Sequence, residues 1–356
     1  MNGQTIRTFL SANGAEGFMS LYPRFFDGID QYIIKGGPGT GKSSMLKSVA
    51  KESIHNGYFT EYVYCSSDSD SLDGVYIDAL KTAICDGTAP HTADPKYPGA
   101  CGEIINISEC WNSKELKKSK SDIIQLNKTI SACYEKAYRY LKAAACVYED
   151  KRHLVQKYIY TNKIDSFCKN FIKKHLQDKN FEQKTGNVFD RFLSSFTPQG
   201  FVTFKDTIYT MADNVYVLKD KYDISPMIIK TISDACIHNG YNIYRFYDPM
   251  AKNRILHLTI PQLNIALVTG NKKTNFIPQN TRAIKTDRFI NDEVAEISNK
   301  LNYADKIISM AEKQALDNIK YAKQLHDDLE DIYISSMDFD KVGRMTALAM
   351  TKIFIK

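Results

Sequence analysis

In the first third of the chain, short apolar runs alternate with segments in which apolar residues recur at helical spacing. The apolar residues 32–34 predict a strand at 32–35, and residues 43–55 carry apolar side chains at helical spacing up to Asn56-Gly57. Further strands are predicted at 61–64 and 81–86. Alternating strands and helices of this kind favour an α/β domain built on a mostly parallel sheet.

Two later segments show a heptad pattern, with apolar residues at alternating spacings of three and four. They run from Leu116 to Leu154 and from Val294 to Ile332, and each predicts a long helical arm. The predicted contact positions include Cys133, Ala137, Tyr140 and Leu154 in the first arm and Ala315, Asn318 and Ala322 in the second. The arms are expected to pack on each other or on shorter returning helices at 162–177 and 338–354. A dimer of chains is the competing possibility. Residues 18–26 and 201–211 are expected to be helices leading into each first core strand.

The sequence is duplicated. A shift of 183 residues aligns about eighty positions without a gap, including the identical stretches 54–58 and 237–241, and a shift of 178 residues aligns the two arms. A period of this size indicates two copies of a whole domain rather than a solenoid. The predicted organisation is a core at 1–112, an arm at 113–185, a second core at 186–290 and a second arm at 291–356.

A complete GxxxxGK[ST] motif, GGPGTGKS, lies between the first predicted strand and its helix. Glycines allow such a loop to curl until its N–H groups face an anion, the lysine reaches the phosphates and the serine hydroxyl binds Mg²⁺. The residues expected to hold ATP are Gly36, Gly37, Pro38, Gly39, Thr40, Gly41, Lys42, Ser43 and Ser44. The alternative is a glycine-rich turn that ends in Gly-Lys-Ser by chance.

The second copy lacks these residues. At the shift of 183, the four glycines of the motif become Lys219, Asp220, Tyr222 and Ile224, while Ser225 replaces Lys42. Apolar positions persist between the copies, so the fold is kept where the phosphate chemistry is lost. We therefore expect one intact nucleotide site in each chain.

Carboxylates near the motif are candidates for metal binding and catalysis. Asp86 ends the strand predicted at 81–86, where a Walker B aspartate would complete the Mg²⁺ shell, although a strand-end turn residue is the alternative. Because Gly87 follows it, a catalytic base would have to come from elsewhere. Asp68 and Asp73 follow the strand at 61–64 and are candidates for a catalytic or acceptor-binding role, with plain turn or capping acids as the alternative.

Other candidates are weaker. His91 is close enough in sequence to reach the phosphates, but a lone histidine is more often structural. The tetrapeptide at 162–165, Asn-Lys-Ile-Asp, matches a guanine-reading motif but follows a helical arm, so ATP is expected rather than GTP. If the halves pack as an intrachain pseudo-dimer, arginines of the second copy could act on the first site as an arginine finger, although ordinary surface arginines are the default. They are Arg245, Arg254, Arg282 and Arg288.

Composition narrows the remaining choices. The 356 residues are 43% hydrophobic, with no apolar run suited to a signal peptide or a membrane span, so a cytoplasmic protein without membrane contact is expected. The eight cysteines show no metal-ligand spacing and are expected to be reduced and mostly buried. The net charge of +6 is concentrated at 113–185, which holds 17 Lys/Arg against 8 Asp/Glu. A solvated helix face explains this better than nucleic-acid binding, which is not excluded.

Several strings outside the motif are more specific: CSSDSDSLDG, AICDGTAPH, DPKYPGA at 94–100 and EIINISECW at 103–111. Together with GGPGTGKS, they resemble an uncharacterised family of tandem P-loop ATPases from Firmicutes-type bacteria, over nearly the whole chain. The resemblance implies two joined nucleotide-binding halves and ATP binding, without supplying a substrate. Residues 219–226 depart from it and put nucleotide binding by the second half in doubt.

The sequence thus predicts an α/β protein with two tandem P-loop NTPase domains of three layers, each followed by a helical arm. The expected function is Mg²⁺-dependent ATP hydrolysis coupled to conformational change, with Lys42 stabilising phosphoryl charge and Ser43 and Asp86 binding the metal. The alternatives are a kinase for a small molecule and a nucleotide-gated binding protein with little turnover. The protein or small-molecule partner is unknown.

Overall fold

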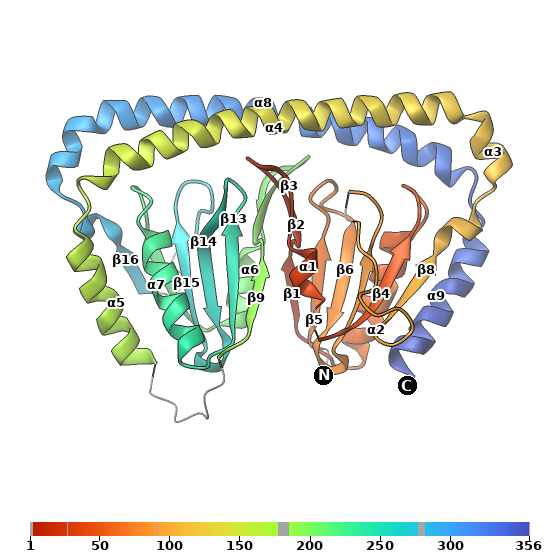
Figure 1. The fold of residues 1–356 in the computed structure, drawn as a ribbon, viewed down its shortest axis with the longest axis horizontal. Coiled ribbons are helices and arrows are strands. Elements are labelled where there is room, and N and C mark those ends of the chain that lie inside the picture. Colours follow the sequence, from red (N-terminus) through yellow and green to blue (C-terminus); the bar gives the residue numbers. More distant parts are fainter. Residues whose placement is uncertain (1–2, 27, 91, 177–184, 277–281, 356) are drawn as a thin grey trace.

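The computed structural model describes residues 3–26, 28–90, 92–176, 185–276 and 282–355. It is an α/β structure with two similar halves, each built on a mixed sheet of mostly parallel strands, lying side by side beneath two long helices (Figure 1). His91 lies outside the described residues. None of the described helices is long and apolar enough to span a membrane.

The two halves repeat the same order of elements. In the first half these are β1 (Thr5–Thr8), β2 (Ser11–Gly14), β3 (Gly17–Ser20), α1 (Tyr22–Phe25), β4 (Asp30–Lys35), α2 (Lys42–His55), β5 (Thr60–Tyr64), β6 (Leu72–Ile77), β7 (Thr82–Asp86) and β8 (Gly102–Asn106). In the second half they are β9 (Val188–Arg191), β10 (Ser194–Thr197), β11 (Gly200–Thr203), α6 (Lys205–Met211), β12 (Asn214–Lys219), α7 (Ser225–His238), β13 (Ile243–Asp248), β14 (Ala251–Ile260), β15 (Ile265–Gly270) and β16 (Arg282–Lys285). The helices outside the cores are α3 (Ser113–Lys118), α4 (Lys120–Gln156), α5 (Thr161–His175), α8 (Ser298–Ile334) and α9 (Phe339–Phe354).

Each half has a six-stranded sheet, in the order β1-β5-β6-β7-β4-β8 in the first half and β16-β12-β15-β14-β13-β9 in the second. Within the first sheet only β6 runs antiparallel to its neighbours β5 and β7, and β14 does the same in the second. In the first half, β4 lies between β7 and β8 and is parallel to both. The carboxyl ends of β4 and β7 therefore share one edge of the sheet, where ligands bind in folds of this class.

The halves meet at the edges formed by β1 and β9. Phe9 and Phe192, which are 183 residues apart, exchange two backbone hydrogen bonds of 2.9 Å, so the pseudo-twofold axis passes between them. Next to these two hydrogen bonds, Ile6 and Phe9 of the first half share a buried cluster with Phe192, Phe204 and Phe246 of the second. The halves therefore form an intrachain pseudo-dimer with a continuous apolar core at the junction.

The two arms pair with each other within one chain. Helices α4 and α8 both have 37 residues and cross the two halves as a bridge (Figure 1). The predicted contacts Cys133, Ala137, Ala315 and Ala322 are buried and Tyr140 is partly buried against the same cluster, but at two positions the most buried residue lies one place later than predicted. There the fully buried residues are Leu141 and Ile319 rather than Tyr140 and Asn318, because a straight helix with 3.6 residues per turn drifts from a strict heptad.

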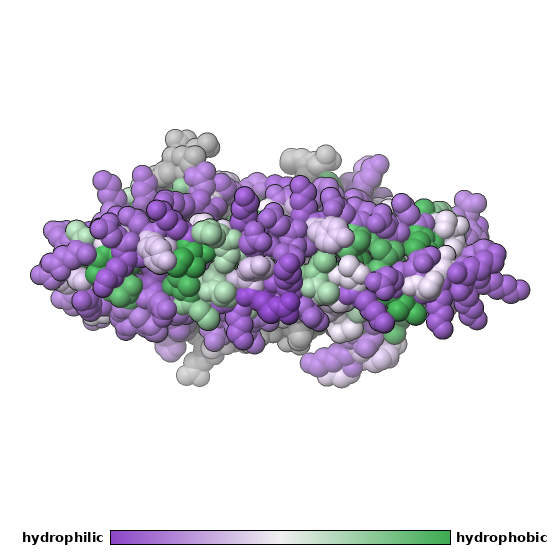
Figure 2. All heavy atoms as spheres, turned by 90° about the horizontal axis from the view of Figure 1, so that it is seen from above, coloured by the Kyte–Doolittle hydropathy of each residue, from purple (hydrophilic) through white to green (hydrophobic). Residues whose placement is uncertain are grey.

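The same drift moves the end of the first arm, where Val155 is buried and Leu154 is not. The arms also start later than predicted: Ser119 interrupts the first between α3 and α4, and Val294 lies in a 3₁₀ segment before α8. Viewed onto the bridge, its outer face is largely hydrophilic with a few apolar patches (Figure 2).

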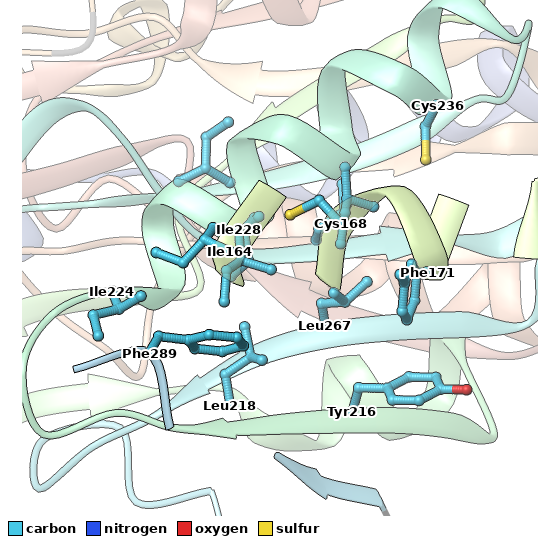
Figure 3. Packing of buried hydrophobic residues seen from close by; sticks show 14 of the residues in the cluster. Ile164, Cys168, Phe171, Tyr216, Leu218, Ile224, Ile228, Cys236, Leu267 and Phe289 are labelled. Carbon is cyan, nitrogen blue, oxygen red and sulfur yellow. The ribbon is translucent and has the colours of Figure 1, made fainter. Parts of the chain in front are cut away.

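The shorter helices exchange halves. Helix α5, which follows the arm of the first half, packs on α7 of the second half, with Ile164, Cys168 and Phe171 against Ile228 and neighbouring side chains (Figure 3). Helix α9 in turn packs on α2 of the first half, where Val342 and Ile353 join its buried cluster. Each half is therefore completed by the arm that follows the other half.

The two segments predicted to be helices before each first core strand begin instead as β-strands. The segments 18–26 and 201–211 begin as strands β3 and β11, which form hairpins with β2 and β10 and only then turn into α1 and α6. The hairpins reach the bridge: the Tyr138 hydroxyl of α4 donates a hydrogen bond to Asn13 of β2 at 2.8 Å. All eight cysteines are free, and Cys101 and Cys146 are exposed.

Candidate functional site

The loop at 36–43, called the glycine loop here, connects the end of β4 to the start of α2. The first hydrogen bond of α2 runs from Met45 N to Gly41 O at 3.0 Å. The backbone N–H groups of residues 41–44 therefore precede the helical ladder, and a helix start of this kind attracts anions through these donors and the helix dipole. No side chain caps the helix at Gly41.

Two glycines of the loop adopt backbone conformations that side chains disfavour. Gly39 has φ +65° and Gly41 has φ +91°. A Cβ atom on Gly39 would also lie 2.8 Å from the carbonyl oxygen of Glu330. Any larger residue at position 39 would be strained and would displace the arm helix α8.

Lys42 and Asp86 meet at the mouth of the glycine loop. Lys42 Nζ donates to Gly36 O at 3.2 Å and to Gly37 O, and lies 3.5 Å from Asp86 Oδ2. Both side chains are largely buried, with 12% and 14% of their surface exposed. The Lys42 side chain thus folds back onto carbonyl groups of the glycine loop.

Asp86 ends β7 beside the strand that precedes the glycine loop, paired in register with Ile34 of β4. Its Oδ1 accepts a hydrogen bond from Thr88 N at 2.8 Å, and the Thr88 hydroxyl donates to Gly36 O at 2.9 Å. This chain of contacts fixes the carboxylate next to the loop. Ser43, the other predicted metal ligand, accepts a hydrogen bond from Leu72 N at 3.0 Å through its hydroxyl oxygen.

The remaining residues of the predicted nucleotide site form the walls of the loop. Thr40 is buried, and its hydroxyl donates to Gly37 O at 2.8 Å. Pro38 is half-buried in the loop, and Ser44 is exposed in the first turn of α2.

Asp68 and Asp73, the other two candidate carboxylates, have different surroundings. Asp68 stabilises its own turn by accepting from Asp70 N at 3.1 Å and from the Ser71 hydroxyl at 2.9 Å, and its Oδ2 lies 3.5 Å from Lys323 Nζ on α8. Asp73 is buried within strand β6. Burial, reinforced by the nearby Asp73 carboxylate, raises the pKa of the Cys65 and Cys85 thiols well above the usual range.

The structure adds arm residues to the site that the sequence did not indicate. Glu330 of α8 accepts a hydrogen bond from Gly39 N through Oε1, at 3.2 Å. A Cβ atom on Gly37 would lie 2.7 Å from the ring of Tyr333, and one on Gly41 would lie 3.3 Å from Val342 of α9. The end of the second arm therefore lies directly on the glycine loop.

The environment of Glu330 carries further charged groups of α8. His326 Nδ1 lies 3.8 Å from Glu330 Oε1, and Lys323 pairs with Asp327. Burial lowers the pKa of His326 although Glu330 opposes the change. In the sequence these residues belong to the polar face of a heptad helix. The heptad pattern does not tell which core this helix crosses, so it could not assign them to the site.

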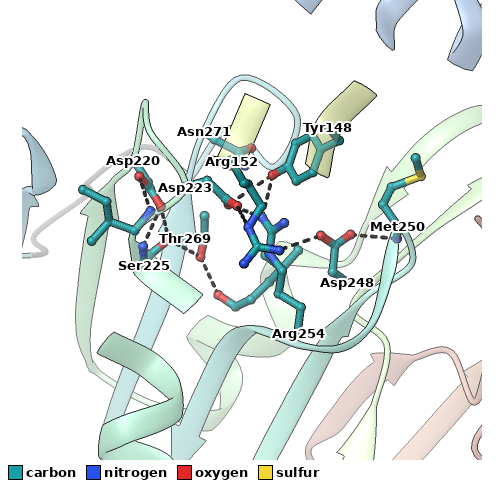
Figure 4. Close-up of polar contacts among 12 residues, drawn as sticks. Tyr148, Arg152, Asp220, Asp223, Ser225, Asp248, Met250, Arg254, Thr269 and Asn271 are labelled. Carbon is teal, nitrogen blue, oxygen red and sulfur yellow. Dashed lines mark hydrogen bonds and ion pairs between the residues drawn. The ribbon is translucent and has the colours of Figure 1, made fainter. Parts of the chain in front are cut away.

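The equivalent loop of the second half is closed by its own carboxylate. Asp220, at the position of Gly37, accepts hydrogen bonds from the backbone N–H groups of Tyr222, Ile224 and Ser225 at 3.2, 3.1 and 2.7 Å (Figure 4). The Ser225 hydroxyl also donates to Asp220 and shares a hydrogen bond of 2.8 Å with Thr269, which stands in the place of Asp86. An internal anion thus occupies the helix start that is open in the first half.

Two weaker predictions are not supported by the arrangement. The candidate arginine fingers stay within the second half: Arg245 pairs with Asp190, Arg254 with Asp223, and Arg282 donates to Tyr216. Arg288 lies over the rings of Phe167 and Phe289. The tetrapeptide at 162–165 starts α5, which packs on the second half and not at the glycine loop.

No known protein family, curated protein or solved structure matches this chain. The resemblance to tandem P-loop ATPases therefore rests on the sequence strings alone, and the functional argument rests on the geometry of the glycine loop.

Proposed function

We propose that the chain binds Mg²⁺-ATP at the glycine loop and hydrolyses it, with the arm formed by α8 and α9 moving in response. The observation that carries this proposal is the contrast between the two loops. In the first half, the start of α2 is uncapped and Lys42 and Asp86 stand beside it. In the second half, Asp220 fills the same position. The duplication thus supplies an internal reference in which the anion site is already occupied.

The donor set of the first half suits a magnesium ion. Mg²⁺ prefers oxygen ligands, and the Ser43 hydroxyl and the Asp86 carboxylate both lie at the carboxyl edge of the sheet beside the loop. Once bound, the ion would neutralise charge on the phosphates and polarise the bond to be broken. Lys42 would exchange its contacts with the loop carbonyls and Asp86 for contacts with phosphate oxygens.

The contact between Glu330 and Gly39 supports coupling to the arm. The Gly39 N–H group can donate to a phosphate oxygen or to Glu330, and two anions cannot share it without strong repulsion. A hydrogen bond to a charged group contributes about 1.5–3 kcal/mol. Binding of the polyphosphate would therefore break the hydrogen bond between Gly39 and Glu330 and weaken the contact of α8 with the glycine loop.

Glu330 provides the experiment. Replacing it by Gln keeps the size of the side chain but removes the charge that competes with ATP, so the Kd for Mg²⁺-ATP should fall about tenfold, a change of about 1.4 kcal/mol. Asp328→Asn is the matched control, because it removes the same charge from an exposed position of the same helix and should leave the Kd within twofold. Equal effects of both substitutions would rule out direct competition at the loop.

Phosphate release from ATP and GTP, measured with and without Mg²⁺, tests the reaction itself, with Lys42→Ala as the inactive reference. Release that needs no added acceptor supports a hydrolase and contradicts an obligate kinase. Tight binding without release would replace the hydrolase proposal by a nucleotide-gated binding protein. Failure to bind either nucleotide would overturn the proposal.

A further inference from the structure

A cavity of about 690 Å³ lies in the second half, between α4, α8 and the carboxyl ends of β12 and β15. Its volume is within the range of sites that bind small molecules. The apolar part of its wall is formed by Val155, Phe201, Leu256, Phe276 and Ile308. It corresponds by the duplication to the mouth of the glycine loop in the first half, although its chemistry is different.

The floor of the cavity holds a buried arginine. Arg254 is 7% exposed and contacts Asp223 and the Tyr148 hydroxyl, with Asp248 at 3.6 Å from its Nε (Figure 4). Its Nε and Nη1 atoms have no hydrogen-bond partner among the described residues. Burial raises the pKa of Asp223 to about 7 although Arg254 opposes the rise.

The lysines that line the mouth of the cavity differ in their ionic partners, and the exposed carboxylate of Asp287 also lies in the lining. Lys151 and Lys273 are paired with Asp305 and Glu312. In contrast, the exposed side chains of the other lining lysines make no ion pair with the described residues. These are Lys219, Lys221 and Lys272.

The arm reverses its charge between the two sites. Arg152 of α4 lies 178 residues before Glu330 of α8 and lines the cavity, with its Nε 3.4 Å from Asp223 Oδ2. In the first half the arm thus presents a carboxylate to the sheet edge, and in the second it presents a guanidinium. The Nη1 atom of Arg152 also pairs with Glu149 of α4 at 2.8 Å, so an added anion would share this guanidinium with two carboxylates.

The anion that fits cannot be a second triphosphate held by backbone N–H groups, because Asp220 already occupies the start of α7. Recognition must come from side chains, and the apolar wall requires a body to cover it. We propose that this cavity binds a small organic anion, an aromatic or similarly apolar molecule carrying a single carboxylate or phosphate group. Its charged group faces Arg254 and the mouth lysines, and its body packs against Val155, Phe276 and Ile308.

The test uses the full chain and 8-anilinonaphthalene-1-sulfonate, a fluorescent aromatic anion. One equivalent is expected to bind, and phenyl phosphate and benzoate are expected to displace it where benzyl alcohol does not. The stronger of the two competitors identifies the preferred head group. Displacement by all three alike would show that charge is not recognised and would overturn the proposal.

Variants at exposed positions locate the binding without disturbing the core. Ser309→Trp, which places a large side chain at the cavity wall, should abolish binding, and Lys221→Glu with Lys272→Glu should weaken it at least tenfold. Lys306→Glu, an exposed position of α8 outside the cavity, is the matched control and should have no effect. Unchanged binding in Ser309→Trp would show that the dye binds elsewhere. Binding must also persist in the unsubstituted chain saturated with Mg²⁺-ATP, because loss there would assign the dye to the glycine loop.

Discussion

The junction between the halves contains a buried ion pair whose removal has a calculable cost. Arg191 of β9 donates to both oxygens of Glu61 of β5, at 2.6 and 2.9 Å, and the two side chains are 4% and 0% exposed. The Thr8 hydroxyl donates to the same carboxylate at 2.5 Å. Replacing Arg191 by Met would leave a buried carboxylate with one neutral donor.

Breaking a buried pair in this way costs about 3–5 kcal/mol, since the desolvated charge loses its partner. Adding Glu61→Gln removes that charge while Gln can still accept a hydrogen bond from Thr8, so the double variant should lose only about 1–2 kcal/mol. The free energies of unfolding would come from urea titrations followed by circular dichroism and by the fluorescence of Trp111, with coincident transitions required.

A second pair at the same junction serves as the control. Arg7 and Asp206 also join the two halves, at 2.7 Å, but they are 43% and 51% exposed. Exposed pairs contribute about 0–1 kcal/mol, so Arg7→Met should cost far less than Arg191→Met. Equal costs for the two arginines, or additive effects of Arg191→Met and Glu61→Gln, would refute the reasoning.

Three further predictions concern stability and the loop. Burial raises the pKa of Asp223 to about 7 from its ordinary 3.8. Between pH 3.8 and pH 7 the folded state therefore binds a proton that the unfolded state has lost, so the free energy of unfolding falls as the pH rises. Asp223→Asn should therefore remove about 2 kcal/mol of the difference in unfolding free energy between pH 5 and pH 7, and an unchanged difference would show that Asp223 titrates normally. Ala315→Leu, at a fully buried position between α4 and α8, should lower the free energy of unfolding by about 1–3 kcal/mol through overpacking. Gln314→Leu at the neighbouring exposed position should change it by less than about 0.5 kcal/mol. Equal effects would argue against close packing of the arms. Gly39→Ala should cost about 1–2 kcal/mol in thermal unfolding, because alanine is strained at φ +65° and its Cβ meets the backbone of α8; an unchanged melting temperature would contradict the contact.

The elements that depend on local patterns could be predicted from the sequence. The strand before the glycine loop, helix α2 and the strand that ends in Asp86 all lie where apolar spacing placed them. The heptads predicted two long helices with close contacts, but they left open whether the arms pair with each other, with the returning helices or between chains. The drift of a straight helix also moved the most buried positions from Tyr140 to Leu141 and from Asn318 to Ile319.

The exchange of arms could not be predicted, and neither could the residues it brings to the site. A heptad pattern gives an apolar stripe but does not tell which core its return helix will cover. Glu330 and Tyr333 reach the glycine loop only because α8 crosses back over the first half. Asp220 lies five residues before α7, too far to be read as an ordinary N-cap, so its occupation of the loop is seen only in the three backbone donors whose hydrogen bonds it accepts.

The measurement that tests the central proposal most directly is the stoichiometry of Mg²⁺-ATP binding by isothermal titration calorimetry. The proposal predicts one site per chain, weakened at least tenfold by Lys42→Ala and unchanged by Ser225→Ala at the equivalent position of the second half. Two sites per chain, binding that survives Lys42→Ala, or equal losses in the two variants would contradict a single nucleotide site at the glycine loop.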